Sequence, residues 1–222
     1  MSKSKRLILP VSPRRRRSQS GLESIEFGLW ALLVMPAFVW MFINGFNFIR
    51  YNKASDVTRA AAMMYIKNSP MNTVGPHRIL ERIANGLDLQ VDSGNTIINN
   101  AGSGMIALTK VQYIGAECGC ENASQYVITQ RLYVGNRSLV INSQTVESFS
   151  GAPPSGIWNS SSGLVSNYST NTAARASPAF ATVWGSSLAN GQVVYLVESF
   201  FRTPPLGSGE FDSRGIYTRI YM

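Results

Sequence analysis

The feature that most limits how this chain folds is an unbroken apolar stretch at residues 28–49. These 22 residues, GLWALLVMPAFVWMFINGFNFI, contain no charged side chain. As a helix rising about 1.5 Å per residue they would extend roughly 33 Å, enough to cross the hydrocarbon core of a bilayer. A secretory signal peptide has a shorter apolar region, roughly 7 to 15 residues, followed by a small-residue cleavage site, and this stretch has neither. We therefore expect a transmembrane helix, with its membrane part at about residues 26–49, rather than a buried helix of a soluble protein.

The distribution of charge predicts which way the chain crosses. Residues 1–21 carry seven basic side chains and no acid, so 13 of the 20 basic and all 12 acidic residues lie after residue 21. Residues 14–17 are all arginine, and only Arg50 and Lys53 follow the apolar stretch closely. Because basic segments stay in the cytoplasm, we expect the N-terminus inside and the C-terminal part outside. That part is nearly neutral and lacks the basic face that phosphate contacts need, so we expect no nucleic-acid partner.

A second pattern lies between the arginines and the apolar stretch, in the segment RRRRSQSGLESIEFGLW. Gly21 ends the basic leader, Leu22 follows it, and Glu26 is the fifth residue after Gly21. This arrangement resembles the type IV prepilin class, in which a membrane-embedded aspartyl peptidase cuts after the glycine. The S-G-x-x-x-x-E-F block, the central Pro36 and the following N-x-A-x-D-x-x-R-A-A-A more narrowly resemble TadE-type minor pilins, or pseudopilins, of the tight-adherence (Flp) pilus system. The resemblance covers roughly residues 14–66.

This resemblance implies both a function and a set of partners. Residues 1–21 would be a cytoplasmic leader that is removed between Gly21 and Leu22, and Glu26 would act in assembly. The product would be a minor pilin or pseudopilin that takes part in assembling a type IV (Flp) pilus and in surface adhesion. Its partners would be a prepilin peptidase, other pilin subunits and the inner-membrane assembly platform. The protein would reside in the bacterial inner membrane with its C-terminal domain in the periplasm, or be built into a surface pilus.

The alternative is an uncleaved anchor, in which Gly21 is a flexible joint and Glu26 caps the helix at the membrane interface. The protein would then be a membrane-anchored adhesin or assembly factor with a periplasmic binding domain. The bulky side chains of Trp30 and Trp40, less usual in a helix that must bundle tightly, agree with this alternative.

The apolar stretch continues into a segment of good helix formers that ends before Pro70. We expect one long helix over residues 22–66, whose second half packs Val57, Ala61 and Met64 against a domain.

A second, short helix is predicted to begin near Pro76 and to end near Gly86. Its apolar face would consist of Ile79, Leu80 and Ile83.

The rest of the chain predicts a small sheet. Five segments are rich in β-branched and aromatic residues, namely residues 105–114, 126–134, 139–146, 193–201 and 216–221. Helices followed by strands predict an α+β fold, in which the long transmembrane helix continues into an exported domain, residues 67–222, with an antiparallel sheet. A polar insertion at about residues 151–192 reads as a flexible loop whose aromatic side chains attach it to the sheet, or as a contact surface at its tip; these aromatics are Trp158, Tyr168, Phe180 and Trp184.

Cys118 and Cys120 form the sequence CGC in a segment that we expect to be exported, where oxidation is favoured. We rank a local disulfide first, free thiols second and a metal site third, since the chain holds no other cysteine and a single histidine, His77.

No pattern in the chain predicts an enzyme or a cofactor. HExxH, GxSxG and P-loop motifs are absent from the sequence. His77 and Glu81 lie four residues apart and would share a helix face, which we interpret as an exposed ion pair. The acid pairs Asp88/Asp92 and Glu210/Asp212 could line a cleft, but solvated turns explain them more simply.

Overall fold

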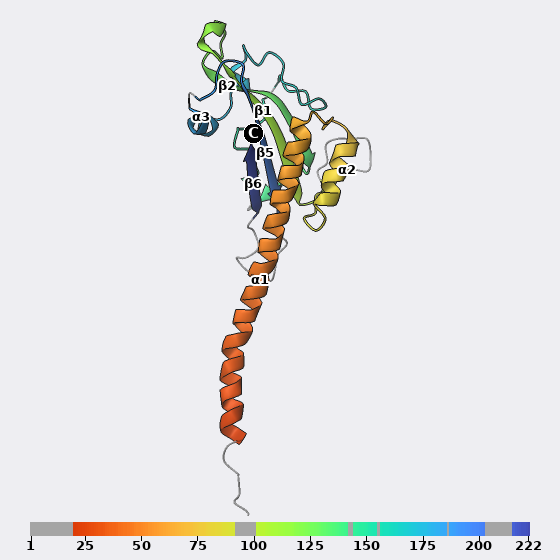
Figure 1. Cartoon of the computed structure of the whole chain (residues 1–222), viewed down its shortest axis with the longest axis vertical. Coiled ribbons are helices and arrows are strands. Elements are labelled where there is room, and N and C mark those ends of the chain that lie inside the picture. Colours follow the sequence, from red (N-terminus) through yellow and green to blue (C-terminus); the bar gives the residue numbers. More distant parts are fainter. Residues whose placement is uncertain (1–19, 92–100, 142–143, 155, 186, 203–214) are drawn as a thin grey trace, which may run out of the picture. The chain divides into compact units, whose positions relative to one another are not determined.

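The computed structural model describes residues 20–91, 101–141, 144–154, 156–185, 187–202 and 215–222 (Figure 1). The chain divides into two compact units, residues 1–45 and residues 46–222. Helix α1 (Ser20–Ile66) begins in the first unit and ends in the second, so its two parts are described separately. The elements confirm the α+β class, with a long apolar N-terminal helix and a small antiparallel sheet.

Helix α1 agrees with the predicted helix over residues 22–66 to within two residues at its start. Its end is fixed by Asn68, which adopts a left-handed conformation with φ of 55°. The amide of Ser69 donates to the Met64 carbonyl at 3.0 Å, and the amide of Asn68 donates to Tyr65 at 3.1 Å. These bonds satisfy carbonyls of the last turn that have no helical partner, and Pro70 cannot continue the helix.

The main sheet is fully antiparallel, with strand order β2-β1-β5-β6. Leu108 in the central strand β1 pairs with Leu132 on one side and Val197 on the other. The register of β1 and β2 shifts between Lys110 and Val111. Four of the five predicted strands are thereby confirmed, as β1 (Gly104–Ile114), β2 (Gln125–Gly135), β5 (Val193–Phe201) and β6 (Ile216–Tyr221).

The predicted strand at residues 139–146 is wrong. Two short strands, β3 (Val140–Ile141) and β4 (Gln144–Thr145), pair with each other in a separate sheet. Their register leaves two residues between them, Asn and Ser in the sequence, and both favour turns over continuous strands.

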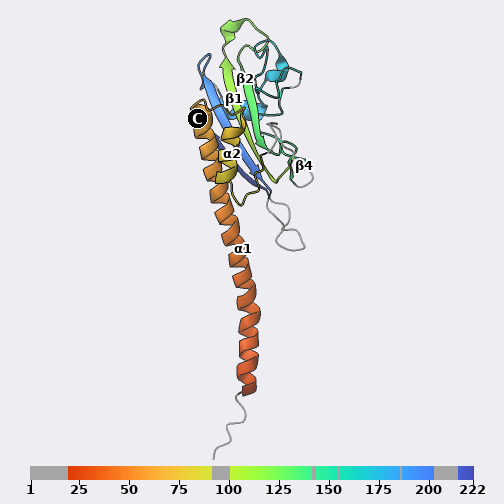
Figure 2. The same cartoon turned by 90° about the vertical axis from the view of Figure 1, so that its right-hand side faces the viewer.

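Helices α1 and α2 cover one face of the main sheet (Figure 2). Val57 and Ala61 of α1 are fully buried and Met64 is partly buried, as the sequence predicts. Three buried hydroxyls fix α1 on this face, since Thr58 Oγ1 lies 2.6 Å from Ser199 Oγ in β5 and 2.5 Å from Thr218 Oγ1 in β6. Small side chains and hydroxyl contacts together allow the helix to approach the sheet closely.

Helix α2 (Val74–Ile83) forms where the sequence predicts a second helix, but its apolar face is different. Ile79 is 51% exposed and Ile83 is 38% exposed, whereas Leu80 and His77 are buried. The helix faces the core through positions 77, 80 and 84, which lie on one side at helical spacing. The predicted apolar face is therefore right for Leu80 and wrong for Ile79 and Ile83, because the packing places His77, not an isoleucine, against the core.

The opposite face of the sheet is covered by the segment that we predicted as a polar insertion. This segment contains the 3₁₀ turn η2 (Thr172–Ala174) and helix α3 (Pro178–Trp184), which the sequence reading did not predict. Phe180 of α3 is fully buried against the sheet. Backbone bonds such as Arg131 to Gly163, at 2.7 Å, join the segment to the outer edge of β2. Joining this edge to the segment satisfies backbone groups of β2 that the main sheet leaves unpaired.

Candidate functional site

Helix α1 already includes Gly21 and Leu22, the two residues that the sequence predicts to flank a cleavage site. The bond between them follows directly on Ser20, the first described residue of the helix. Residues 1–19 of the predicted basic leader lie outside the described residues.

Glu26 lies on an exposed apolar surface of α1. Its neighbours Ile25 and Phe27 are 65% and 75% exposed. The exposed apolar surface continues to Phe48 and Ile49, which are 66% and 57% exposed. The helix is long and apolar enough, by length and composition, to span a membrane. An exposed apolar surface of this extent is typical of contact with lipid or with other apolar helices. A carboxylate in that setting needs a cationic partner.

The apolar part of α1 contains two local departures from a plain helix. Pro36 has no backbone N–H, so the carbonyl one turn before it loses its helical hydrogen bond. Asn44 donates its side-chain amide to the Trp40 carbonyl at 2.7 Å, which satisfies this polar side chain inside the helix. Both features are compatible with a helix in an apolar environment.

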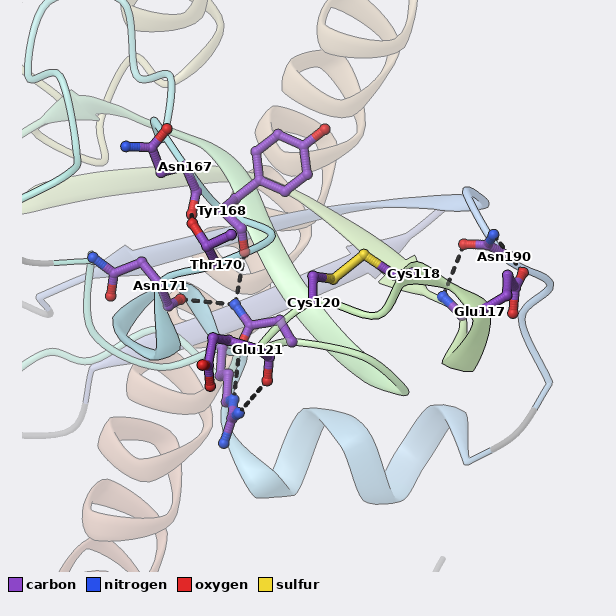
Figure 3. Close-up of a disulfide and its surroundings, with 12 residues drawn as sticks. Glu117, Cys118, Cys120, Glu121, Asn167, Tyr168, Thr170, Asn171 and Asn190 are labelled. Carbon is purple, nitrogen blue, oxygen red and sulfur yellow. Dashed lines mark hydrogen bonds between the residues drawn. A yellow bond between two sulfur atoms is a disulfide. The ribbon is translucent and has the colours of Figure 1, made fainter.

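Cys118 and Cys120 are joined by a disulfide in the connection between β1 and β2 (Figure 3). Gly119 between them adopts a left-handed conformation, with φ of 62°, and no atom outside its chain neighbours lies within 4 Å of where its Cβ would be. The outer side of the bend at Gly119 is therefore open. We refer to residues 115–122 as the disulfide tip.

One side chain holds the first flank of the disulfide tip. Asn190, in the loop before β5, accepts a hydrogen bond from the Gly115 amide at 2.8 Å and donates to the Glu117 carboxylate at 2.6 Å (Figure 3). This one amide thus orients the 3₁₀ turn η1 (Ala116–Cys118) that leads into the disulfide.

The second flank is held by Asn122, which is fully buried. Its side-chain amide donates to the carbonyls of Tyr168 and Asn171, at 2.7 and 2.8 Å. Arg175 donates from Nε to the Asn122 carbonyl oxygen at 2.8 Å and from Nη2 to the Glu121 backbone at 2.7 Å. The segment that covers the sheet therefore holds the tip as well.

The disulfide tip lies at one end of the second unit. Thr58 of α1 contacts Ser199, and Tyr65 further along α1 contacts Tyr195 with 5.3 Å between ring centroids, so α1 runs antiparallel to β5. Strand β1 is also antiparallel to β5, so it runs in the same direction as α1 and reaches the tip where α1 ends. Within this unit the tip is at the end opposite to residue 46, where the helix enters.

A buried polar network that the sequence reading missed lies on the face opposite α1. Arg131 of β2 and Glu198 of β5 are both 0% exposed. Arg131 donates from Nη2 to Ser150 Oγ at 2.5 Å, Ser150 lies 2.9 Å from Ser148 Oγ, and Ser148 donates to the Glu198 carboxylate. Two serine hydroxyls thus link the buried cation to the buried anion. We call these four residues the Arg131–Glu198 relay.

Further contacts surround the relay, although the buried Nε of Arg131 has no hydrogen-bond partner. Glu198 Oε1 accepts from the Phe149 amide at 2.9 Å and from the Tyr217 hydroxyl at 2.7 Å. Burial, followed by the charge and hydrogen bond of Glu198, raises the pKa of Tyr217. Arg131 Nη1 donates to the Gly151 carbonyl at 3.0 Å. Arg131, Ser150 and Glu198 are fully buried, whereas Tyr217 is 39% exposed. The network therefore holds residues 148–151 on the sheet and reaches the surface through Tyr217.

The relay was not predictable from spacing, since its charged members lie in different strands. The available signal was local: Arg in ITQRLYVG and Glu in VVYLVESFF interrupt apolar strand sequences. A charge in such a run is buried only when it is paired or hydrogen-bonded.

A shallow groove of about 270 Å³ lies between the end of α1, β2 and the covering segment. None of its lining residues is charged; they are Tyr65, Asn68, Ser69, Pro70, Met71, Asn72, Gln130, Leu132, Ser162 and Leu164. Among the described residues, no group of three His, Cys, Asp or Glu side chains could hold a metal ion.

The other predicted polar sites are placed differently from the prediction. His77 is buried and its Nε2 lies 2.8 Å from the Met71 carbonyl, so the predicted exposed ion pair with Glu81 is wrong. Glu81 instead accepts from the Val91 amide at 3.3 Å. Asp88 accepts from Ser103 and Gln90, each at 2.7 Å, as a turn residue does. Asp92, Glu210 and Asp212 lie outside the described residues.

When the chain is compared with protein-family models, curated proteins and solved structures, none of the three sets gives a match.

Proposed function

We propose that this protein is a minor pilin or pseudopilin of a tight-adherence (Flp, type IV) pilus, which takes part in pilus assembly and surface adhesion. The observation that carries the proposal is the combination of the Gly21 to Glu26 spacing with a helix whose apolar surface is exposed next to Glu26. The packing of residues 54–62 of the same helix on a small antiparallel sheet supports it, because a subunit of this class needs one helix for the membrane or fibre and one domain for contacts.

The chemistry of the junction supports removal of the leader. Cleavage after Gly21 would create an α-amine at Leu22, about one helical turn from Glu26. Pairing of this amine with the carboxylate, in the same or a neighbouring subunit, would neutralise a charge that costs about 2.5 kcal/mol or more at the membrane centre. Cleavage would also remove the seven basic residues that hold the N-terminus in the cytoplasm. Maturation would thus prepare the helix to leave the bilayer.

The proposal requires a prepilin peptidase, other pilin subunits and an inner-membrane assembly platform as partners. It places the unprocessed chain in the inner membrane as a single-pass protein with its domain in the periplasm. Neither an enzymatic activity nor a cofactor is part of the proposal.

The second candidate is an uncleaved membrane-anchored adhesin or assembly factor. Trp30 and Trp40, which are 62% and 69% exposed, favour it, because large rings limit the close approach of packed helices. In this case Glu26 stays at the membrane interface and the basic leader remains part of the mature protein.

The mature N-terminus distinguishes the two candidates. We expect co-expression of the full chain with a prepilin peptidase to produce a chain that starts at Leu22, measured by intact mass and N-terminal sequencing. Gly21→Ala should block the cut. Glu26→Gln, which keeps the side-chain shape but removes the charge, should allow the cut and reduce incorporation into fibres. An unchanged mass, with a peptidase that cleaves a known prepilin in the same cells, contradicts the proposal.

A further inference from the structure

The disulfide tip combines an accessible sulfur–sulfur bond with a backbone that other contacts hold in place. Cys118 is exposed and Cys120 is half-buried. Apart from Cys118 and Cys120 themselves, no group lies within 4 Å of where a Gly119 side chain would begin. Of the two cysteines, the exposed Cys118 is therefore the one that a thiol can reach more readily.

The disulfide is poorly suited to a stapling role. It joins residues two positions apart, and the stabilisation from closing a loop is smallest for the shortest loops. The first flank of the bond is already fixed by Asn190 (Figure 3). The second flank is fixed by Asn122 with Arg175. We therefore expect the tip to keep its fold when the bond is opened.

From this arrangement we propose that the Cys118–Cys120 disulfide is a thiol–disulfide exchange site that accepts a cysteine thiol of a partner protein. The inference does not depend on the proposed function. Its position supports contact with a partner, since the tip is at the end of its unit away from residue 46.

The exchange is balanced without any further reagent. The thiolate of the partner attacks Sγ of Cys118 and forms a new sulfur–sulfur bond with it. The Cys118–Cys120 bond breaks, and its electron pair leaves on Sγ of Cys120, which then takes a proton from water. The sulfur of the partner is oxidised and that of Cys120 is reduced. Attack by Cys120 on the mixed disulfide reverses the step and releases the partner.

Two acids adjust the exchange. Glu117 and Glu121 are next in sequence to the two cysteines, and their negative charge disfavours both the attacking thiolate and the leaving thiolate. Both effects slow the exchange. Glu121→Gln keeps the backbone carbonyl that binds Arg175 but removes one charge. We expect it to accelerate exchange about three-fold, from the interaction of unit charges a few ångströms apart in water.

The test uses the full, uncleaved chain purified in detergent with the disulfide formed. The probe is a short neutral peptide with one cysteine, and the products are quenched with acid and identified by intact mass and peptide mapping. We expect a one-to-one adduct on Cys118, with the near-UV circular dichroism of the domain unchanged. An adduct that forms only under conditions that unfold the domain would overturn the proposal.

Two variants complete the test. The double variant Cys118→Ser/Cys120→Ser should form no adduct and should melt within a few degrees of the wild type; a domain that fails to fold without the bond would mean that the disulfide is structural, against the proposal. Cys120→Ser, loaded with the peptide by exchange with its activated disulfide, should retain the adduct, because the resolving thiol is absent. Rapid release of the peptide from Cys120→Ser would also count against the proposal. Neither assay requires leader cleavage, so failure here leaves the pilin proposal untouched.

Discussion

At the scale of single residues, the buried His77 couples the stability of the domain to pH. It is 1% exposed, and its Nε2 lies 2.8 Å from the Met71 carbonyl. Burial lowers the pKa of His77 below its ordinary value of 6.5, and the hydrogen bond to Met71 opposes this shift only in part. The neutral imidazole is therefore the form that the fold prefers.

The sign of the pH dependence follows from this shift. Below pH 6.5 the unfolded chain binds a proton at His77 more readily than the folded chain, so stability is present above this pH and is lost as the pH falls. We expect the melting temperature to decrease from pH 7.5 to pH 5, with a loss of up to about 1.4 kcal/mol per pH unit. Thermal melts of the full chain in detergent, followed by near-UV circular dichroism, measure it.

The matched variant is His77→Gln, whose amide can still donate to the Met71 carbonyl but does not titrate. Because His77 is the only histidine of the chain, this variant should show a nearly flat profile over the same pH range. Equal slopes for the variant and the wild type would refute the assignment. Asp88 does not interfere, because its net pKa shift is downward, away from this pH range. Burial raises its pKa, but the hydrogen bonds from Ser103 and Gln90 lower it by more.

The single-residue predictions from sequence succeeded where chemistry is local and failed where it depends on packing. Burial of Val57 and Ala61 was predictable from helical spacing in a good helix former. The burial of His77 was not, since Ile79 and Ile83 are more apolar and only the rotation of α2 on the core decides which residue faces inward.

At the scale of elements, the Arg131–Glu198 relay fixes residues 148–151, which lead into the covering segment, to the sheet. These residues contribute Ser148 and Ser150, and the sheet contributes the two charges. We expect Ser148→Ala to destabilise the domain by about 1–3 kcal/mol, because it removes a donor from a buried carboxylate and leaves that charge less satisfied. Hydrogen exchange should increase at residues 149–151 more than at residues 54–62 of α1, on the other face.

Ser161→Ala is the matched control, since Ser161 is an exposed serine of the covering segment and is not part of the relay. It should change stability by less than about 0.5 kcal/mol and leave hydrogen exchange at residues 149–151 unchanged. If both variants behave alike, the relay does not hold residues 148–151 on the sheet.

Elements with a strong repeating pattern were predictable, and those defined by a few contacts were not. Strands β1, β2, β5 and β6 each combine β-branched and aromatic residues over six positions or more. Helix α3 has seven residues within a polar segment, and its start depends on Ser177, which accepts from the Phe180 amide at 3.2 Å. The Ser-Pro pair before it is a helix-start signal that the low-complexity composition concealed.

At the scale of the whole molecule, the chain combines an exposed apolar helix with a domain whose own core is complete. The first helical unit has no buried apolar residue in the window that qualifies as a membrane span, whereas the second unit has clusters on both faces of its sheet. The sequence predicted this division from the apolar stretch alone. Its orientation in a membrane rests on charge, which is a separate question from the fold.

The orientation can be tested by reporters fused after Met222. We expect a reporter that is active only in the periplasm to give signal, and one that is active only in the cytoplasm to give none, because seven basic residues precede the helix and only Arg50 and Lys53 follow it closely. Replacing the four arginines at residues 14–17 by glutamine should weaken this bias and produce a mixed population. The matched control replaces Arg50 and Lys53 by glutamine, which increases the charge difference across the helix and should leave the orientation unchanged.

Cytoplasmic activity of the unmodified chain would place the disulfide tip in a reducing compartment, where a stable disulfide is disfavoured. The reporter result and the redox state of Cys118 and Cys120 should therefore agree, with the disulfide present where the reporter shows periplasmic activity.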